Sequence, residues 1–363
     1  MKPIVVKVGT AVISRPEGGL NASRIRALAD ELGGLAKKGL RPILVTSGAI
    51  GAGMDAFGWK TRPTVLKDKQ AAAAVGQPVL MEAYKAAFAP LGVAVAQVLL
   101  TRADLDDRER YLNIRNTLGA LLERGVVPII NENDTVATQE IKFGDNDTLS
   151  ALVAARMDAA RLFILTDVDG LLTSTGADGQ LLPEIFQITP DIEALVQAGT
   201  GSAKSVGGMA SKLSAARLAM ASGVEVWIAS GRRPGMVRDI LEGKGVGTRF
   251  VASPEALSAR KRWIAFGRKL RGAFHLDEGA ARAVTEGKRS LLPSGVVRVE
   301  GAFDPGDTVR LVAPDGREIA RGLTAFGAAD VRKIKGHRSQ EIENLLNRAA
   351  PAELIHRNNL VVL

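Results

Sequence analysis

The chain contains no cysteine and only three histidines among its 363 residues. The absence of cysteine excludes disulfides, a thiolate metal site and a cysteine nucleophile. All three histidines lie at or after position 275, so none is available as a general base in the first two-thirds of the chain. No apolar run reaches membrane-spanning length, and Lys7 interrupts the opening MKPIVVKVGT. We therefore expect neither a membrane span nor a signal peptide.

Two common nucleotide-binding fingerprints are also missing. No GxxxxGK[ST] segment occurs, which excludes a P-loop. The spacing Gly51-x-Gly53 lacks the third glycine of a dinucleotide fingerprint, which disfavours a Rossmann cofactor site. Any phosphate site in this chain must therefore be built differently.

Length and charge indicate two folded parts. A chain of 363 residues with 46% hydrophobic residues is too long for one ordinary core. Residues 1–259 carry 29 Lys and Arg against 27 Asp and Glu, whereas residues 260–363 carry 19 against 12. This basic C-terminal part is typical of a polyanion-binding module or of an ordinary solvated surface. We predict a catalytic domain at 1–259, a linker at 260–271, a small β-domain at 272–350 and a tail at 351–363.

The first 259 residues alternate short apolar runs with helical patterns. We expect strands at residues 4–8, 42–46, 93–100, 126–130, 162–166 and 224–229. Helices are predicted at 21–38, 69–88, 113–124, 148–157 and 211–221, with Asn21 and Asn113 as N-caps. This alternation predicts an α/β fold, a mainly parallel sheet sandwiched by helices. After Arg260, β-like runs at 295–299, 307–312 and 318–322 are bounded by turn residues, which predicts a small β-barrel.

Several predicted strands end in loops of small or polar residues. The carboxyl ends of parallel strands share one edge, so these loops should converge. Lys7 lies in the first strand and Gly9 follows that strand. A buried lysine is costly unless its ammonium group meets anions, so Lys7 suits either a phosphate site or an exposed strand edge. Ser47 follows the second strand within TSGAIGAG, which suits either an anion nest or an ordinary tight connection.

Acidic and amide side chains follow later strands. Asn131 and Asp134 come directly after the strand at 126–130 and suit either a small zwitterionic ligand or a simple turn. Asp145 and Asp147 flank an asparagine at the mouth of a helix, and two carboxylates exceed what capping needs. Thr166 begins another such loop, which could hold a nucleotide or form a turn.

The strongest local signal is GGMASK at residues 207–212. Paired glycines at a helix start offer backbone N–H groups to phosphate. Lys212 lies in the first helical turn, where its charge opposes the helix dipole unless an anion is bound. Two lysines at such loops, together with an acidic helix mouth, fit phosphoryl transfer by positioning and charge neutralisation.

The segments KVGTAVI, VTSGAIGAG, LLTRADLDDRERYLN, VPIINENDTVAT, FGDNDTLSALVA, LTDVDGL and GGMASKL, in this order, resemble the glutamate 5-kinases of the amino acid kinase family. HLDEGAARAV, SLLPSGVVRVEGAF and GHRSQEIE extend the resemblance into a PUA-like domain. The resemblance covers essentially the whole chain. It implies an amino acid kinase fold and ATP-dependent phosphorylation of the L-glutamate side-chain carboxylate. The products would be L-glutamyl 5-phosphate and ADP, in the first step of proline biosynthesis.

The resemblance also implies roles for individual residues. Lys7 and Lys212 would flank the transferred phosphoryl group, with Asp147 between them. The residues that would bind glutamate or support its pocket are Ser47, Asp134, Asn146, Asn131 and Asp145. The residues that would hold ATP are Lys7, Thr166, Asp167, Val206, Gly207, Gly208, Met209, Ala210, Ser211 and Lys212. Mg²⁺ would be carried by the ATP phosphates, and no residue is assigned as a metal ligand.

Further expectations come from the same resemblance. They are proline as feedback inhibitor, a homo-oligomer (dimer or tetramer), a downstream glutamyl phosphate reductase and a cytoplasmic location. Val206 stands where the family usually has threonine, so only its backbone can serve ATP. Lys204 is unusual in this loop, and a solvated role is favoured over a phosphate contact.

Two other functions stay open from the sequence. A different amino acid kinase would use aspartate, N-acetylglutamate, carbamate or a nucleotide as acceptor. An RNA-binding protein would act through the basic PUA-like domain. That part has few aromatics suited to base stacking, mainly Trp263, Phe266, Phe274, Phe303 and Phe326.

Overall fold

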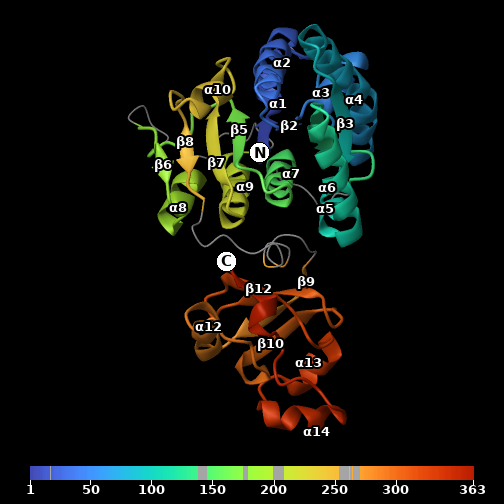
Figure 1. Cartoon of the computed structure of the whole chain (residues 1–363). Coiled ribbons are helices and arrows are strands. Elements are labelled where there is room, and N and C mark those ends of the chain that lie inside the picture. Colours follow the sequence, from blue (N-terminus) through green and yellow to red (C-terminus); the bar gives the residue numbers. More distant parts are fainter. Residues whose placement is uncertain are drawn as a thin grey trace. The chain divides into compact units, whose positions relative to one another are not determined.

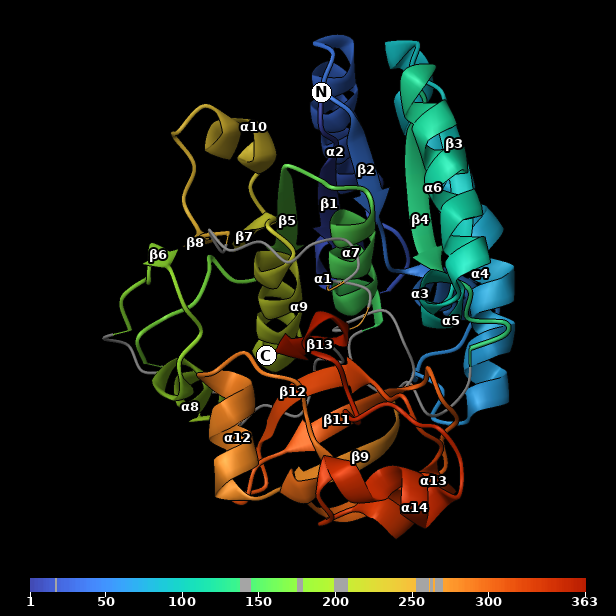
Figure 2. The same cartoon turned by 60° about the horizontal axis from the view of Figure 1, so that its bottom comes forward.

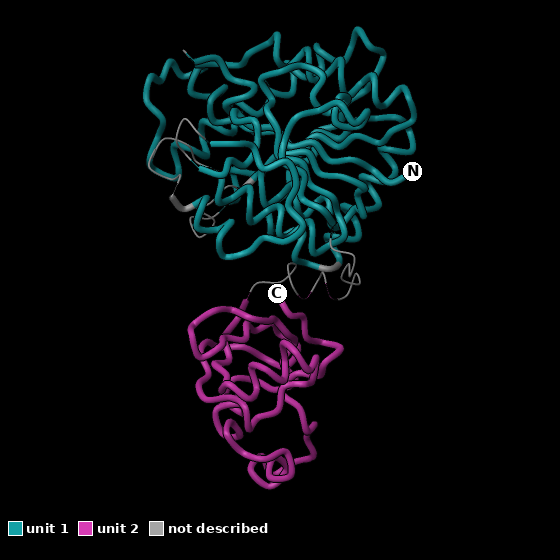
Figure 3. Tube along the Cα trace, turned by 90° about the vertical axis from the view of Figure 1, so that its left-hand side faces the viewer, with its two compact units in different colours: residues 1–256 teal, residues 257–363 magenta. Residues whose placement is uncertain are grey.

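The computed structural model describes residues 1–16, 18–137, 145–174, 179–198, 208–252, 261, 264 and 270–363. The chain divides into two compact units, Met1–Ala256 and Leu257–Leu363 (Figure 3). Most of the predicted linker, 260–271, lies outside the described residues. No helix among the described residues is both long enough and apolar enough to cross a bilayer.

The first unit contains an eight-stranded sheet in the order β3-β4-β2-β1-β5-β7-β8-β6 (Figure 1). All neighbouring strands are parallel except β7 and β8, which confirms the predicted mainly parallel sheet. The strand bounds are β1 Ile4–Val8, β2 Pro42–Val45, β3 Val95–Leu100, β4 Val127–Glu132, β5 Arg161–Thr166, β6 Glu184–Ile185, β7 Glu225–Ser230 and β8 Thr248–Phe250.

Helices cover both faces of this sheet. Their bounds are α1 Thr10–Ile13, α2 Ala22–Lys37, α3 Ala49–Ala56, α4 Leu66–Phe88, α5 Arg102–Asp106, α6 Arg108–Glu123, α7 Asp145–Arg156, α8 Pro190–Ala198, α9 Met209–Ala221 and α10 Met236–Leu241. One core cluster joins Ile4, Val6 and Val8 of β1 to α2, α4 and α10. On the other face α7 and α9 lie side by side, with α7 against β1 and β5 (Figure 2). Since strand side chains alternate, Lys7 points to the face with α7 and α9.

One of the two predicted helix caps is confirmed. The side chain of Asn21 accepts a hydrogen bond from the backbone N–H of Arg24 at 3.2 Å and caps α2. The prediction for Asn113 was wrong, because α6 begins at Arg108. There Asp107 is the cap and its Oδ1 accepts from the N–H of Arg110 at 2.9 Å. An acidic cap was available earlier in the sequence, so the helix starts there.

Gly53, at the end of the segment TSGAIGAG, and Gly76, on α4, have a packing role. The loop after β2 is short, since α3 already begins at Ala49. A Cβ on Gly53 would lie 1.8 Å from the carbonyl oxygen of Ala72, and one on Gly76 would lie 1.9 Å from that of Ala49. Gly53 and Gly76 therefore let α3 and α4 cross in direct backbone contact, and only residues 46–48 remain as the turn.

The second unit is a small β-domain with a mainly antiparallel five-stranded sheet in the order β10-β9-β11-β12-β13. The strands are β9 Leu270–Leu276, β10 Val296–Gly301, β11 Thr308–Val312, β12 Glu318–Leu323 and β13 Leu360–Val362. The helices are α12 Glu278–Thr285, α13 Ala328–Ile334 and α14 Ile342–Leu346. The residues predicted as a tail belong to this unit. β13 pairs with β12, and Leu354 and Ile355 are buried in the core, because apolar residues at 354–362 complete it.

Candidate active site

One buried carboxylate holds two lysines from distant parts of the chain. Asp147, in the first turn of α7, has a side chain that is 1% exposed. Its Oδ1 lies 2.6 Å from Nζ of Lys7, and its Oδ2 lies 3.4 Å from Nζ of Lys212. The hydroxyl of Ser211 donates to the same Oδ2 at 2.6 Å. The three residues predicted to be catalytic are therefore in direct contact.

Local structure explains this convergence. Lys7 lies on the central strand β1, one residue before its carboxyl end, and the alternation of β1 turns it towards α7. Lys212 lies in the first turn of α9, whose N-cap is Gly208, and its side chain is buried. Gly9 lies beside the ammonium group of Lys7, since a Cβ on Gly9 would be in ordinary van der Waals contact with Nζ of Lys7 at 3.6 Å.

Burial and charge act in opposite directions on these groups. Burial lowers the pKa of Lys7, Asp147 raises it and Lys212 lowers it again, and the result is a pKa below the ordinary 10.5. Burial raises the pKa of Asp147, but the ammonium groups of Lys7 and Lys212 outweigh this and hold it below the ordinary 3.8. With both lysines protonated, the cluster carries one positive charge in excess, which a phosphate oxygen could neutralise.

A chain of amide side chains lies beside this cluster. Nδ2 of Asn146 donates to Oγ of Ser47 at 3.0 Å and to Oδ1 of Asn131 at 3.1 Å. Nδ2 of Asn131 in turn donates to Oε1 of Gln77 at 2.9 Å. The structure thus brings together three of the predicted glutamate-site residues, Ser47, Asn131 and Asn146. Of these, Asn146 directly precedes Asp147 in the sequence.

Two further predicted residues flank this amide chain by position. Asp134 lies in the turn that follows β4, three residues after Asn131. Asp145 opens α7, and its side chain lies outside the described part of the molecule. Both therefore belong to segments that border the site.

The predicted ATP residues are placed in part. Thr166 ends β5, and its Oγ1 lies 3.1 Å from Oδ1 of Asp167. Gly208, Met209 and Ala210 form the start of α9. Val206, Gly207 and Lys204 lie outside the described residues. The hydroxyl of Ser211, a residue also predicted to hold ATP, donates to Oδ2 of Asp147.

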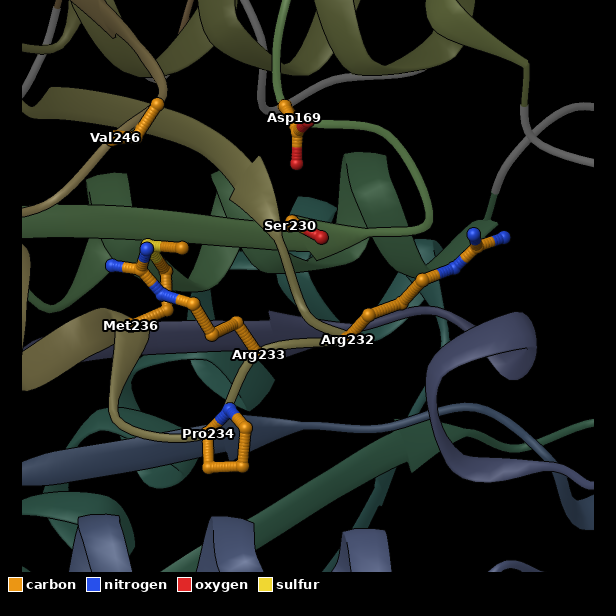
Figure 4. A pocket seen from close by; sticks show the side chains of 7 residues that line it. All are labelled: Asp169, Ser230, Arg232, Arg233, Pro234, Met236 and Val246. Atoms are coloured by element: carbon orange, nitrogen blue, oxygen red, sulfur yellow. The ribbon is translucent and has the colours of Figure 1, made fainter.

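A cavity of about 410 Å³ borders this side of the site (Figure 4). Its lining residues are Asp169, Ser230, Arg232, Arg233, Pro234, Met236 and Val246. Ser230 is the register partner of Thr166, and the N–H of Gly231 donates to the carbonyl of Thr166 at 2.7 Å. The two arginines come from the segment after β7. The cavity thus lies at the carboxyl ends of β5 and β7.

Two supporting features were not anticipated from the sequence. Gln77 is a polar residue on the buried stripe of α4, where Ala73, Leu80 and Tyr84 are its neighbours. The hydroxyl groups of Tyr84 and Thr46 lie 2.7 Å apart, both fully buried, beneath the turn that carries Ser47. A glutamine in an apolar helical stripe was the available signal. In the part of the chain that the structure describes, no cluster of three or more His, Cys, Asp or Glu could hold a metal ion.

Two known protein families match this chain, one in each of its two parts. The model of the amino acid kinase family matches residues 2–230, and that of the PUA domain matches residues 272–346. A glutamate 5-kinase of Moorella thermoacetica is 51% identical over 363 residues, covering 99% of this chain and 96% of that protein. A glutamate 5-kinase of Gloeobacter violaceus is 50% identical over 371 residues, covering 100% of both.

A solved structure gives a likeness of fold. The carbamate kinase from Giardia lamblia bound to AMP-PNP aligns with a TM-score of 0.51 and 20% identity. The alignment covers 69% of this chain and 99% of that chain. At this level of identity the likeness concerns the fold of the first unit alone.

Proposed function

This chain belongs to the amino acid kinase family and matches glutamate 5-kinases along its whole length, and we propose that it phosphorylates L-glutamate at the cluster of Lys7, Asp147 and Lys212. ATP supplies the γ-phosphoryl group. The side-chain carboxylate receives it, giving L-glutamyl 5-phosphate and ADP in the first step of proline biosynthesis. The observation that carries the proposal for the site is one buried carboxylate that holds two lysines.

The chemistry requires charge neutralisation more than proton transfer. The glutamate carboxylate is already ionised at neutral pH, so it can attack the γ-phosphorus in line without a general base. Negative charge on the transferred group and the leaving oxygen is then met by the ammonium groups of Lys7 and Lys212. Asp147 fixes both groups before the substrate arrives, so little reorganisation is needed at the moment of transfer.

Glutamate would bind at the neighbouring amide chain. Ser47 and Asn146 are held together by a 3.0 Å hydrogen bond, with Asn131 behind them. We assign Asp134, in the turn that follows β4, to binding of the substrate and Asp145, which opens α7, to support of the pocket. This arrangement would place the substrate side chain next to Asp147.

ATP would lie over the carboxyl ends of β5 and β7, beside Thr166 and Asp167. The cavity next to Thr166 supports this placement, and the start of α9 offers backbone N–H groups to phosphate. Mg²⁺ bound to the ATP phosphates would neutralise part of their charge. Asp147 already contacts two lysines, so we assign no protein ligand to the metal.

An assay of ADP release tests the proposed phosphorylation of L-glutamate. Purified protein with Mg-ATP is given L-glutamate, L-aspartate, N-acetyl-L-glutamate or carbamate in separate reactions. We expect turnover with L-glutamate to exceed that with each other acceptor by at least about a hundredfold, since a site built to pair polar groups rejects analogues that leave them unpaired. Faster turnover with another acceptor would overturn the substrate assignment.

The expectations about regulation, assembly, partners and location remain predictions. They are inhibition by proline, a dimer or tetramer, a downstream glutamyl phosphate reductase, a cytoplasmic location and RNA binding by the small β-domain.

A further inference from the structure

Gln77 is a buried polar residue to which the proposed reaction gives no role. It lies on α4 with 8% of its surface exposed, among apolar neighbours. Its Oε1 accepts from Nδ2 of Asn131 at 2.9 Å, and its Nε2 lies 3.4 Å from Oε1 of the exposed Gln97. Only the first of these bonds is short and lies within the protein interior. Gln77 therefore acts mainly as a hydrogen-bond acceptor for Asn131.

The backbone fixes the polarity of the amide chain. The N–H of Glu132 donates to Oδ1 of Asn131 at 3.0 Å, and a backbone N–H can only donate. Asn131 must therefore present its oxygen to Glu132 and its Nδ2 to Gln77. The same oxygen also faces Asn146, so Asn146 must present Nδ2, its donor group, to Asn131.

This polarity determines what Ser47 and Asn146 can offer a substrate. Because Nδ2 of Asn146 donates to Oγ of Ser47, the hydroxyl hydrogen of Ser47 is left to donate elsewhere. Oδ1 of Asn146 is buried and has no hydrogen-bond partner among the described residues. A buried acceptor of this kind needs a donor. A hydroxyl donor beside a free acceptor suits a ligand that carries a carboxylate and an ammonium group.

We propose that Gln77 is a positioning residue for amino-acid recognition. It holds the amide of Asn131, and through it the amide of Asn146, so that Ser47 donates to the substrate carboxylate and Asn146 accepts from the substrate ammonium group. The inference rests on the proposed function, because it concerns the acceptor site of the same reaction. Gln77 contacts Asn131, which in turn contacts Asn146, and Gln77 acts on the substrate only through these two amides.

Steady-state kinetics of Gln77→Met and Gln77→Glu test this role. Methionine keeps the length and volume of glutamine but removes the acceptor, whereas glutamate retains Oε1. For Gln77→Met we expect the KM for L-glutamate to rise about tenfold, because Asn131 loses a buried partner. The KM for ATP and kcat should change less than about threefold, since Lys7 and Lys212 are untouched. Gln77→Glu should recover most of the affinity for glutamate.

A substrate analogue separates positioning from general damage. Glutarate is glutamate without its ammonium group, so it makes no use of Oδ1 of Asn146. In Gln77→Met the preference for glutamate over glutarate in kcat/KM should shrink. An unchanged preference, or an equal loss of kcat and of both affinities, would overturn the inference. If Gln77→Met does not fold, Gln77→Asn withdraws the acceptor by one methylene and carries the same expectation.

The matched control is Gln97→Ala. It removes the other partner of Gln77 at an exposed position where water can replace it, and we expect unchanged kinetics. A KM effect equal to that of Gln77→Met would show that Oε1 of Gln77 is not the important contact. Absence of glutamate turnover in the unmodified protein would contradict the proposed function instead, so the two failures are distinguishable.

Discussion

A carboxylate that contacts several basic side chains occurs in each unit of the molecule, and the two clusters around Asp147 and around Glu300 differ in their access to water. In the first unit Asp147 contacts Lys7 and Lys212, and all three side chains are less than 10% exposed. In the second unit Glu300, 32% exposed, contacts His275, Arg298 and Arg310 on the sheet. The composition is similar, but the solvation is not.

The difference in solvent access supports the buried cluster as the proposed catalytic one. Solvent screens the ion pairs of Glu300, and its partners can move away at little cost. Around Asp147 each charge was removed from water, which is costly unless the geometry and the pairing are good. Such a cluster with a surplus positive charge serves an anion better than it serves stability. The buried cluster should therefore be sensitive to single changes, whereas the exposed one should tolerate them.

The largest expected effect is on turnover. Lys212→Ala should lower kcat by about a hundredfold or more, because one of two groups that meet the developing charge is removed. Asp147 would still contact Lys7 and Ser211, so the thermal midpoint should change little. Steady-state ADP release and thermal unfolding measure the two effects. The matched control is Lys85→Ala on the exposed side of α4, which should leave kcat unchanged. Near-full turnover of Lys212→Ala would contradict the assignment.

The next effect is on stability. Asp147→Asn keeps the shape but leaves two buried ammonium groups without an anion, so the free energy of unfolding should fall by about 3 kcal/mol. Urea denaturation at neutral pH measures this loss. Since the folded-state pKa of Asp147 lies below its ordinary value, its contribution is present at neutral pH and is lost only as pH falls through that lowered pKa. An unchanged urea midpoint in Asp147→Asn would mean that the lysines do not depend on this carboxylate.

A smaller effect should appear as proton uptake. Burial holds the pKa of Lys7 below 10.5 in the free protein, and phosphate oxygens beside it would raise that pKa. ATP binding should therefore take up a fraction of a proton between the lowered pKa and 10.5, and the affinity for ATP should weaken as pH rises through this window. Calorimetry at alkaline pH in two buffers of different ionisation enthalpy measures the uptake. Equal heats in both buffers would indicate that Lys7 does not meet the phosphates.

The smallest effect belongs to the exposed cluster. Glu300→Gln removes the charge that His275, Arg298 and Arg310 share, at a position open to water. We expect no measurable change in kcat and only a slight change in the urea midpoint. A loss of stability as large as that of Asp147→Asn would remove the contrast between the two clusters.

Much of the fold follows from local pattern. The short apolar runs predicted β1, β2, β3, β4, β5 and β7 of the first sheet. Because parallel strands end at one edge of a sheet, the expected convergence of their loops agrees with the contact between Lys7 and Asp147. β6 and β8, with two and three residues, are too short to give a periodic signal. Asn113 was mistaken for a cap because local rules do not choose between Asn113 and the acidic Asp107 nearby.

The candidate site was less accessible to local reasoning. Sequence spacing alone does not reveal that Lys7, Asp147 and Lys212 share one contact, and the resemblance to a family supplied that expectation. The sequence gives little indication of the role of Gln77, because alanine dominates the α4 segment and the hydrogen-bond partner of Gln77 is Asn131 on strand β4, far away in the sequence. The sequence leaves Gly53 open between an anion nest and a tight connection, whereas in the structure its lack of a side chain allows α3 and α4 to cross in close contact. The roles of Gln77 and Gly53 thus depend on contacts between residues far apart in the sequence, which local sequence patterns do not reveal.

The most direct test is a crystal structure with a non-hydrolysable ATP analogue, Mg²⁺ and L-glutamate bound. We expect Nζ of Lys7 and Nζ of Lys212 both within hydrogen-bond distance of oxygens around the γ-phosphate, with the glutamate side-chain carboxylate in line for attack. A bound γ-phosphate that contacts neither lysine, or a carboxylate on the wrong side of it, would contradict the proposed mechanism.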